Sequence, residues 1–307
     1  MDDVPQRLTD EEFDRRVSMA QAIDAIEGAL CEHAAGTLES PPRFALDLDG
    51  GSLVFTAGAA TRQGVMGYRV YETFPDSPDD QQLVSVYDAE TGAFCGSVLG
   101  YRVGAVRTGA IGGVAIDQMA RADATTLGII GSGRQARTQL EATAVVRAFE
   151  RVRVYSPTPE HRERFADEMG DRLGLEIEAV ETAADAVSEV DVLITATSST
   201  KPVFDPEWLS PGTHVNTLGP KFAGTNELDP VIGSRADLVV TDSLAQVAGY
   251  SRPFFLNGTD QDRLVELSAL VDNEAGGRRD TDEITLFCSV GLAGTEVVLA
   301  SEAFGDG

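Results

Sequence analysis

The chain has 307 residues, 42% of them hydrophobic, which is enough for two domains with cores of their own. Its 50 acidic residues outnumber 24 basic ones, and the resulting charge of −26 argues against a nucleic-acid partner, because phosphate binding needs positive charge. The acids are spread along the whole chain, and only Lys201 and Lys221 are lysines. This pattern favours a solvated surface suited to concentrated salt, hence a halophilic source, over a binding face for one basic partner.

Location and metal content follow from what the sequence lacks. No apolar run approaches the roughly 20 residues of a membrane-spanning helix. The acidic start, residues 1–5, has neither the basic nor the apolar part of a signal peptide. We therefore expect a cytoplasmic protein without membrane contacts. The three cysteines and three histidines are scattered, which predicts neither a disulfide framework nor a metal site.

The N-terminal third has the pattern of an α+β domain. Apolar residues at helical spacing, among them Phe13, Val17 and Ile23, predict one helix over residues 10–32, with Pro41 and Pro42 ending it. Alternating apolar runs then predict short strands, separated by turn signals such as the one at residues 75–78. The predicted strands are residues 44–46, 53–56, 68–71 and 83–87. Such a succession is typical of an antiparallel sheet.

Further along, helices and strands alternate. A helix of small residues is predicted at about residues 108–120. Strands follow at residues 127–130, 152–155, 192–195, 214–217 and 238–240, with helices at 134–149 and 159–169. This alternation predicts a parallel, doubly wound sheet, so the fold class is α/β with a Rossmann-type domain.

The turn after the first of these strands carries a phosphate-binding pattern. It reads Gly131-Ser132-Gly133-Arg134-Gln135-Ala136. Gly131 permits the tight turn, Gly133 lets the backbone approach a pyrophosphate, and Ala136 allows the helix to pack closely on the sheet. The anion would lie on the free N–H groups at the helix start. We therefore predict that these residues bind NAD or NADP.

The end of the second strand bears on the choice of cofactor. An NAD enzyme usually places a carboxylate about 20 residues beyond the turn, whereas Ser156 and Thr158 occupy this stretch here. We assign both to the cofactor site. With no carboxylate to repel a 2′-phosphate, and with Arg162 and Arg164 just beyond, NADP is mildly favoured over NAD. The alternative is that these arginines only decorate an exposed helix.

Several other stretches resemble one family when taken together. They are residues 41–43, 66–70, 105–110, 128–139, 211–216, 227–230 and 283–293. Jointly they resemble the ornithine cyclodeaminase/mu-crystallin family, which includes archaeal alanine dehydrogenases and ketimine reductases. The resemblance implies an α+β substrate-binding and homodimerisation domain, residues 1–117 with 288–307, to which a C-terminal helix at about residues 289–304 returns. Residues 118–287 would form the Rossmann domain.

The resemblance also implies that arginines hold the substrate carboxylate. Arg43 and Arg107 match the positions that do this in the family. A planar guanidinium pairs with a carboxylate through two parallel hydrogen bonds. Because we expect a helix to begin near Thr108, Arg107 would lie at a helix start, where the dipole favours an anion. We assign Thr108 to the cofactor site.

Two positions depart from the family pattern. The family usually has a lysine where Arg69 stands, and a guanidinium can anchor or polarise but is a poor proton donor. Ornithine cyclodeaminases carry an aspartate at about the place of Lys221, where a cation would repel the side-chain ammonium of ornithine. We predict Arg69 and Lys221 as catalytic residues. Burial near arginines would lower the pKa of Lys221 and let it supply the proton; the alternative is an exposed loop lysine.

The leading interpretation is an NAD(P)-dependent oxidoreductase acting on a small amino acid or its imine, with a neutral or acidic side chain. A second interpretation is an ornithine cyclodeaminase-type lyase, which releases ammonia while its cofactor is reduced and reoxidised within one cycle. A third is a non-catalytic dimer that binds the dinucleotide without turnover.

Overall fold

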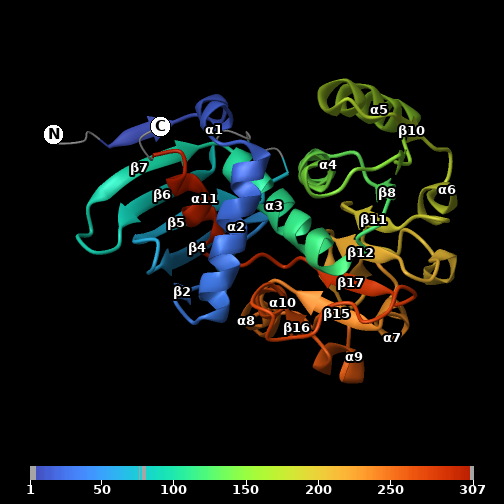
Figure 1. Ribbon diagram of the computed structural model, residues 1–307. Helices are drawn as coiled ribbons and strands as arrows, with labels where there is room; N and C mark the ends of the chain where they lie inside the picture. The colour runs from blue at the N-terminus through green and yellow to red at the C-terminus, as the bar shows by residue number, and fades with distance from the viewer. Residues whose placement is uncertain (1–4, 76, 78–80, 305–307) are drawn as a thin grey trace. The chain divides into compact units, whose positions relative to one another are not determined.

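The computed structural model describes residues 5–75, 77 and 81–304, so the acidic start and part of the turn predicted at residues 75–78 lie outside the described residues. The chain forms two compact units. Unit 1 comprises Met1–Ala110 and Gly291–Gly307, and unit 2 comprises Ile111–Val290 (Figure 1). The first division falls inside a continuous helix, α3 (Arg102–Met119). No turn or linker therefore marks this division in the sequence. The domain boundaries predicted from the sequence lie after residues 117 and 287 instead.

Unit 1 is built on a seven-stranded sheet with the order β1-β7-β6-β5-β4-β2, in which β3 pairs with β4. The strands are β1 (Gln6–Leu8), β2 (Leu38–Glu39), β3 (Phe44–Leu48), β4 (Gly51–Ala60), β5 (Val65–Glu72), β6 (Leu83–Asp88) and β7 (Phe94–Leu99). Neighbours are antiparallel except for β1 and β7. The antiparallel sheet is thus confirmed. The sequence pattern does not predict β7, because Gly96 and Ser97 interrupt its apolar alternation.

The N-terminal helix is divided in two, so the prediction of one helix over residues 10–32 is wrong. Helix α1 (Asp10–Arg16) is followed by α2 (Met19–Ala34). The Ser18 hydroxyl accepts a hydrogen bond from the Gln21 backbone N–H, and the Gln21 side chain accepts one from the Ser18 N–H. This capping box satisfies the donors of a new helix start and contributes about 1 kcal/mol. Helix α2 also ends before Gly36, at φ +68°, and not at the prolines.

Two more helices begin several residues away from their predicted starts. Helix α3 begins at Arg102 and not near residue 108, because Asp10 accepts hydrogen bonds from the backbone N–H groups of Tyr101 and Arg102. The C-terminal helix α11 (Thr295–Ser301) is shorter than predicted, since Gly294 precedes it at φ +87°. It packs against α2 and strands β4, β5 and β6, all in unit 1.

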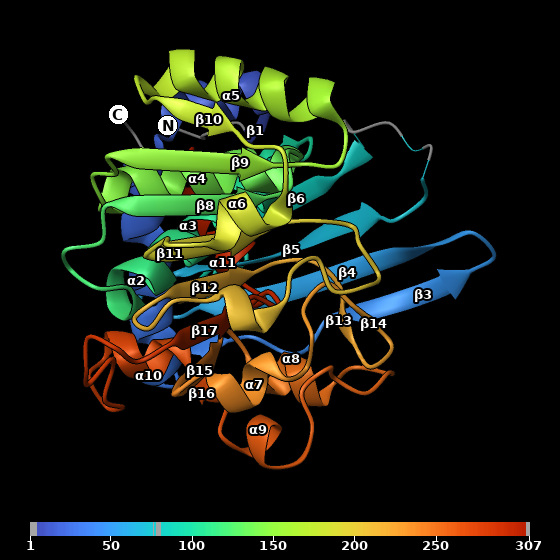
Figure 2. The ribbon, with the colours of Figure 1, turned by 90° about the vertical axis from the view of Figure 1, so that its right-hand side faces the viewer.

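Unit 2 contains an eight-stranded parallel sheet with the order β10-β9-β8-β11-β12-β17-β15-β16 (Figure 2). Its strands are β8 (Thr126–Ile130), β9 (Arg151–Tyr155), β10 (Ile177–Ala179), β11 (Val192–Thr195), β12 (His214–Thr217), β15 (Leu238–Thr241), β16 (Val265–Glu266) and β17 (Thr285–Cys288). A separate ribbon pairs β13 (Lys221–Phe222) with β14 (Thr225–Asn226). The strand order runs outward from β8 in both directions, which confirms the doubly wound sheet and places its switch point between β8 and β11.

Apolar side chains cover both faces of this sheet. Successive strand residues point to opposite faces, so Leu127 and Ile129 join one core cluster while Ile130 joins the other. The remaining helices of unit 2 are α4 (Arg134–Val146), α5 (Pro159–Leu173), α6 (Ala183–Val187), the 3-10 helix η2 (Pro206–Trp208), α7 (Ile232–Arg235), α8 (Leu244–Ala248), α9 (Gly258–Asp262) and α10 (Leu267–Val271). Burying such side chains contributes about 1.5–3 kcal/mol each and holds the strand ends in place.

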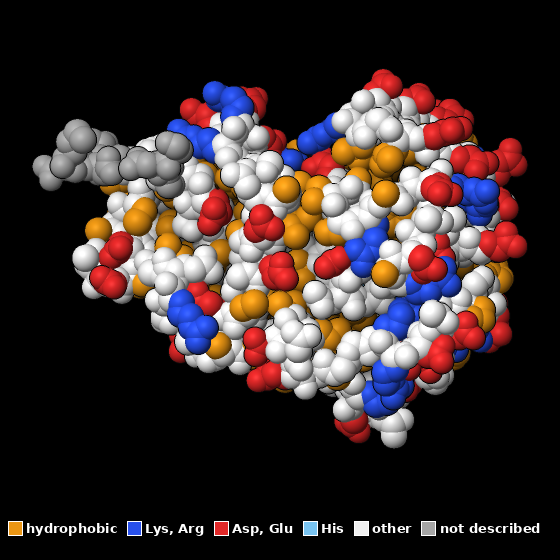
Figure 3. All heavy atoms as spheres, viewed as in Figure 1, with side chains coloured by type: hydrophobic (Ala, Val, Ile, Leu, Met, Phe, Trp, Pro, Cys, Tyr) orange, Lys and Arg blue, Asp and Glu red, His pale blue; other side chains and the backbone are white. Residues whose placement is uncertain are grey.

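Figure 3 shows one face of the molecule, on which Asp and Glu side chains are spread and interrupted by Lys and Arg. An apolar group stands out on β3, where Phe44, Leu46 and Leu48 are 60%, 48% and 63% exposed. Among the described residues, no helix has the length and apolar composition needed to cross a membrane.

Candidate functional site

A cavity of about 680 Å³ lies at the carboxyl ends of the central strands of unit 2. Its walls come from the segments that follow four strands, represented by Gly131 after β8, Ser156 after β9, Thr197 after β11 and Gly219 after β12. Doubly wound sheets bind ligands at this edge, next to the switch point. The volume is within the usual range for small-molecule sites.

Two glycines explain the shape of the cavity beside β8. Gly131 has φ +114°, and a Cβ there would lie 2.3 Å from the Ala196 carbonyl oxygen, so the tight turn requires glycine. A Cβ on Gly133 would meet no atom within 4 Å, which leaves open space over its backbone. Gly133 is the N-cap residue of α4, and no side-chain hydrogen bond caps this end of the helix. The start of α4 therefore offers backbone N–H donors beside open space, which fits a pyrophosphate.

The other predicted cofactor residues fall into two groups. Ser132, Arg134, Gln135 and Ser156 line the cavity together with the two glycines. Ala136 instead is fully buried in the core beneath the turn. Thr158 is the N-cap residue of α5 and is not among the cavity-lining residues. Thr108 belongs to unit 1, where its hydroxyl donates a 2.8 Å hydrogen bond to the Gly104 carbonyl.

A guanidinium lies at the end of β9. Arg162 Nη1 donates a 3.0 Å hydrogen bond to the Ser156 carbonyl oxygen, and its guanidinium carbon is 6.0 Å from the centre of the Tyr155 ring. Arg164, two residues further along α5, is exposed. Arg162 is thus held next to the cavity-lining Ser156, whereas Arg164 points to solvent.

Lys221 is buried in unit 2 and is not an exposed loop residue. It begins β13, is 6% exposed, and its Nζ donates a 2.7 Å hydrogen bond to the Gly219 carbonyl oxygen. Gly219 lines the cavity. The ammonium is therefore tied to the cavity wall through the segment that follows β12.

In unit 1, Arg69 and Arg107 converge on one buried carboxylate. Glu296, at the start of α11, is 1% exposed. Its Oε1 lies 2.9 Å from Arg107 Nη2 and 3.6 Å from Arg69 Nη1. Burial would raise the pKa of the Glu296 carboxyl, but Arg107 and Arg69 outweigh this effect and hold the pKa below its usual range. The group is therefore an ionised cluster in which guanidinium charge exceeds carboxylate charge.

The other contacts of Arg69 and Arg107, and those of the nearby Arg43, differ from one arginine to the next. Arg69 Nη2 donates a 2.6 Å hydrogen bond to Gln82 Oε1, and its guanidinium lies 4.2 Å above the Tyr71 ring centre. Arg43 Nη1 reaches the same Tyr71 at its hydroxyl, 3.5 Å away. Within the described part of the chain, Arg107 Nε is buried and has no hydrogen-bond partner. A buried donor without an acceptor costs about 1–3 kcal/mol, which an incoming carboxylate can recover.

The predicted helix-dipole contribution at Arg107 is wrong. Because α3 begins at Arg102, Arg107 lies in its second turn, and Asp10 already accepts the N–H groups at the helix start. The dipole acts mainly within the first turn. Attraction for an anion at Arg107 thus comes from its guanidinium.

Sequence reasoning missed two acidic residues. Glu296 is the only charged residue between residues 284 and 300, and a lone acid in an apolar stretch is a signal of a buried ion pair. Glu227 lies in the stretch 227–230, which carries the family resemblance, but was given no role. It is fully buried and contacts two cavity-wall segments. Among the described residues, no group of three or more His, Cys, Asp and Glu is placed to hold a metal ion.

The fold and the cavity define a Rossmann-type dinucleotide-binding protein with a second, α+β unit that buries a cluster of guanidinium groups. The sequence profile of the ornithine cyclodeaminase/mu-crystallin family matches residues 4–303. The chain therefore belongs to this family, as the sequence motifs indicate.

Relatives with assigned activities match along nearly their whole length. The alanine dehydrogenase of Archaeoglobus fulgidus is 32% identical over 305 residues, covering 97% of this chain and 93% of the relative. The Thermococcus litoralis Δ1-pyrroline-2-carboxylate reductase, solved with NADH and L-proline, superposes with a TM-score of 0.89 at 31% identity, over 97% of this chain and 96% of that one. An archaeal alanine dehydrogenase dimer with bound NAD gives a TM-score of 0.87 at 30% identity, over 98% and 95%.

Proposed function

We propose that this protein is an NAD(P)-dependent oxidoreductase that acts on a small amino acid or its imine. The observation that carries the proposal is the cavity at the switch point of the sheet, where the open backbone of Gly133 meets the start of α4. Relatives at 30–32% identity are an alanine dehydrogenase, Δ1-pyrroline-2-carboxylate reductases and an iminosuccinate reductase, and two related structures hold NADH or NAD. These relatives support a substrate with a neutral or acidic side chain.

The residues of unit 1 are suited to hold the substrate carboxylate. Arg107 presents a buried Nε donor, and Arg43 adds a third guanidinium to the cluster formed by Arg107 and Arg69. Arg69 stays protonated at any ordinary pH and polarises the substrate without giving up its proton. When bound, the nicotinamide supplies or accepts a hydride at the α-carbon. The protein's contribution is to hold that carbon in position.

Lys221 is the residue that we assign to proton transfer. Lys221 is buried, and its Nζ donates a hydrogen bond to the carbonyl of Gly219, which lines the cavity. The same cation disfavours the cyclodeaminase reaction, because it would repel the side-chain ammonium of ornithine. A Lys221→Met variant with full turnover would remove Lys221 from the mechanism.

The test uses the purified protein with NADPH or NADH and a panel of 2-oxo acids plus ammonium and of cyclic imines. We expect cofactor oxidation with at least one of them. The Gly133→Val variant should fold normally, because a Cβ at this position meets no protein atom within 4 Å, yet lose cofactor binding, because the added side chain occupies the open space. Gly276→Val is the matched control, since a Cβ there also meets no atom within 4 Å.

Other outcomes of this assay identify the alternatives. Ammonia release from ornithine without net cofactor oxidation would identify the lyase. Cofactor binding without turnover of any substrate would identify a dinucleotide-binding protein. If the folded protein binds neither cofactor, the proposal is wrong.

We further propose that NADP is preferred over NAD. The support is local: Ser156 and Thr158 follow β9 where NAD enzymes usually have a carboxylate, and Arg162 is held against the Ser156 carbonyl. Calorimetry with NADPH and NADH in the same buffer measures the preference. Equal or tighter binding of NADH would overturn it.

A homodimer is the assembly that we propose. Phe44, Leu46 and Leu48 expose apolar side chains on β3, and a second copy of the chain would cover them. A related alanine dehydrogenase structure is a dimer. Light scattering should give twice the chain mass of 32.6 kDa, and Leu46→Glu should shift the protein to one copy. A wild-type protein that scatters as a single chain would contradict this.

The acidic surface also leads us to propose adaptation to high salt. At a net charge of −26, mutual repulsion destabilises the folded chain at low ionic strength, and salt screens it. The melting temperature should therefore rise from dilute buffer to molar salt. A melting temperature that is independent of salt would overturn this proposal.

A further inference from the structure

Two segments at the carboxyl edge of the unit 2 sheet converge on the side chain of Glu227. The residue is fully buried. Its Oε1 accepts hydrogen bonds from the hydroxyls of Thr195 and Thr217, at 2.9 and 2.7 Å, and from the backbone N–H of Leu218 at 3.1 Å. The Gly219 N–H donates to the same oxygen. Thr195 ends β11 and Thr217 ends β12, so a single oxygen joins the ends of two adjacent strands.

The second carboxylate oxygen extends the junction into the segment after β11. Glu227 Oε2 accepts hydrogen bonds from the Thr197 backbone N–H at 3.0 Å and from its hydroxyl at 2.8 Å. A Cβ on Gly219 would lie 2.3 Å from Glu227 Cδ, so only glycine fits between the carboxylate and the cavity wall. The carboxylate thus sets the conformation of both segments.

These segments form one end of the cofactor cavity. Ala196, Thr197, Leu218 and Gly219 all line it. In a doubly wound sheet the dinucleotide crosses the switch point, with its adenosine half toward the β8–β9 side. Because β11 and β12 lie on the other side of β8, the segments held by Glu227 face the nicotinamide half.

Each of these contacts to Glu227 comes from a neutral donor, a hydroxyl or a backbone amide. A carboxylate offers acceptor sites on both oxygens for such a set. A glutamine would turn an NH2 group toward one of the N–H donors, and at least one segment would have to shift. The arrangement therefore depends on two acceptor oxygens as well as on the shape of the side chain.

We propose that Glu227 is a positioning residue that fixes the nicotinamide end of the cavity through residues 195–197 and 217–219. It does not touch the cofactor itself. The inference rests on the proposed dinucleotide-dependent function. Small displacements of reacting groups reduce catalysis strongly, so this junction should matter more for turnover than for overall cofactor affinity.

The test compares two ligands in Glu227→Gln. ADP-ribose and its 2′-phosphate contain the adenosine half without nicotinamide, and we expect their affinities to stay within about twofold of wild type. NAD(P)H should bind about tenfold more weakly, and kcat should fall about a hundredfold with a smaller change in substrate KM. Circular dichroism checks the fold.

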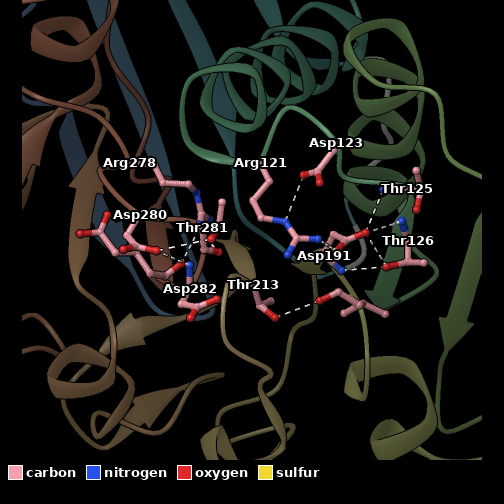
Figure 4. A network of polar contacts seen from close by, with 12 residues as sticks. Arg121, Asp123, Thr125, Thr126, Asp191, Thr213, Arg278, Asp280, Thr281 and Asp282 are labelled. Carbon is pink, nitrogen blue, oxygen red and sulfur yellow. Dashed lines mark hydrogen bonds and ion pairs between the residues drawn. The ribbon is translucent and has the colours of Figure 1, made fainter.

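A matched control lies at the opposite edge of the same sheet. Asp191, just before β11, accepts hydrogen bonds from the backbone N–H groups of Thr125 and Thr126 at 2.8 and 2.9 Å and pairs with Arg121 (Figure 4). Asp191 joins the amino ends of β8 and β11, away from the cavity. Glu227 joins the carboxyl ends of β11 and β12, next to the cavity. Asp191→Asn should lower stability without changing the ratio of NAD(P)H to ADP-ribose affinity.

The outcomes separate this inference from the proposed function. If the wild type binds no dinucleotide, the proposed function fails and takes this inference with it. If Glu227→Gln weakens both ligands equally, or leaves NAD(P)H binding and kcat unchanged, only the role of Glu227 is overturned. Should Glu227→Gln fail to fold, Thr217→Val removes one donor to Oε1 at a buried residue outside the cavity lining and keeps the carboxylate. It should reduce kcat about threefold with unchanged ADP-ribose affinity, and an unchanged kcat would overturn the inference.

Discussion

Both units bury a carboxylate completely, but they stabilise it differently. Glu296 of unit 1 is paired with the guanidinium groups of Arg69 and Arg107. Glu227 of unit 2 is held by hydroxyls and backbone amides. Where guanidinium groups outnumber the carboxylate they pair with, the cluster can bind a further anion. A carboxylate that accepts hydrogen bonds from hydroxyls and backbone amides instead fixes the conformation of the segments that donate them. We propose on this basis that the Glu296 cluster takes up the substrate carboxylate, whereas Glu227 sets the shape of the cavity.

The largest effect should come from removing the charge of Glu296. Glu296→Gln leaves buried guanidiniums without their counter-ion, which should lower the free energy of unfolding by about 3–5 kcal/mol. An added carboxylate such as L-proline should then raise the melting temperature more in the variant than in wild type, because it replaces the lost anion.

Glu32→Gln is the matched control for this comparison. Glu32 is another buried acid of unit 1, but it accepts from the backbone N–H groups of Arg62 and Gln63, both at 3.1 Å. Its variant should gain no extra stabilisation from the carboxylate. Equal ligand-induced shifts in both variants would show that Glu296 is no different from a structural acid.

The next effect concerns Arg107. Arg107→Lys keeps the positive charge but loses the planar pair of donors, so kcat/KM for the imino acid should fall about a hundredfold. Dinucleotide affinity, measured by calorimetry, should stay the same. Arg102→Lys, on the same helix but paired with Asp14 at 2.8 Å, should keep wild-type kinetics. A similar loss in both variants would point to damage of α3 and not to substrate binding.

A third prediction concerns the pH dependence of stability that the buried His214 of unit 2 should cause. Burial lowers the pKa of His214 from 6.5 to about 3, while its ring nitrogens bond Thr285 and Asn216 at 2.8 Å each. The pKa of His214 is lower in the folded than in the unfolded protein, so the neutral ring favours the folded state. This contribution to the free energy of unfolding is complete above about pH 6.5 and is lost as pH falls toward 3. Wild type should lose about 2 kcal/mol of unfolding free energy from pH 7 to 5 through this residue.

The measurement is guanidinium-induced unfolding at both pH values for wild type, His214→Gln and His161→Gln. Other groups also titrate, so the difference between proteins isolates the contribution of each histidine. His214→Gln should lose this part of the pH dependence, and His161→Gln, at an exposed site, should keep it. Parallel profiles for wild type and His214→Gln would refute the prediction.

The smallest effect is expected at Arg162, whose guanidinium donates a hydrogen bond to the backbone carbonyl of Ser156. If it contacts the 2′-phosphate, Arg162→Ala should reduce the preference for NADPH over NADH about tenfold. Arg164→Ala, at an exposed position of the same helix, should leave the preference unchanged. Equal losses in the two variants would indicate only long-range attraction.

Local patterns in the sequence were sufficient to predict several features. The alternation of apolar runs with helical segments gives the doubly wound sheet, and the strands predicted at residues 192–195 and 214–217 match β11 and β12. The glycine pattern that begins at Gly131 predicted the tight turn after β8, where Gly131 has φ +114°. Family motifs identified the arginines of unit 1. These features depend on short-range periodicity, turn geometry or residue type.

Contacts between distant segments decided the rest. Asp10 moves the start of α3 to Arg102, and Glu296 joins Arg69 and Arg107. No local pattern records these pairs, because their members are separated by tens to hundreds of residues. The sequence by itself therefore determined the fold class and the glycine-rich turn of the Rossmann unit. Only the tertiary structure decided which buried charges meet, since the cost of desolvating a charge depends on partners that folding brings together.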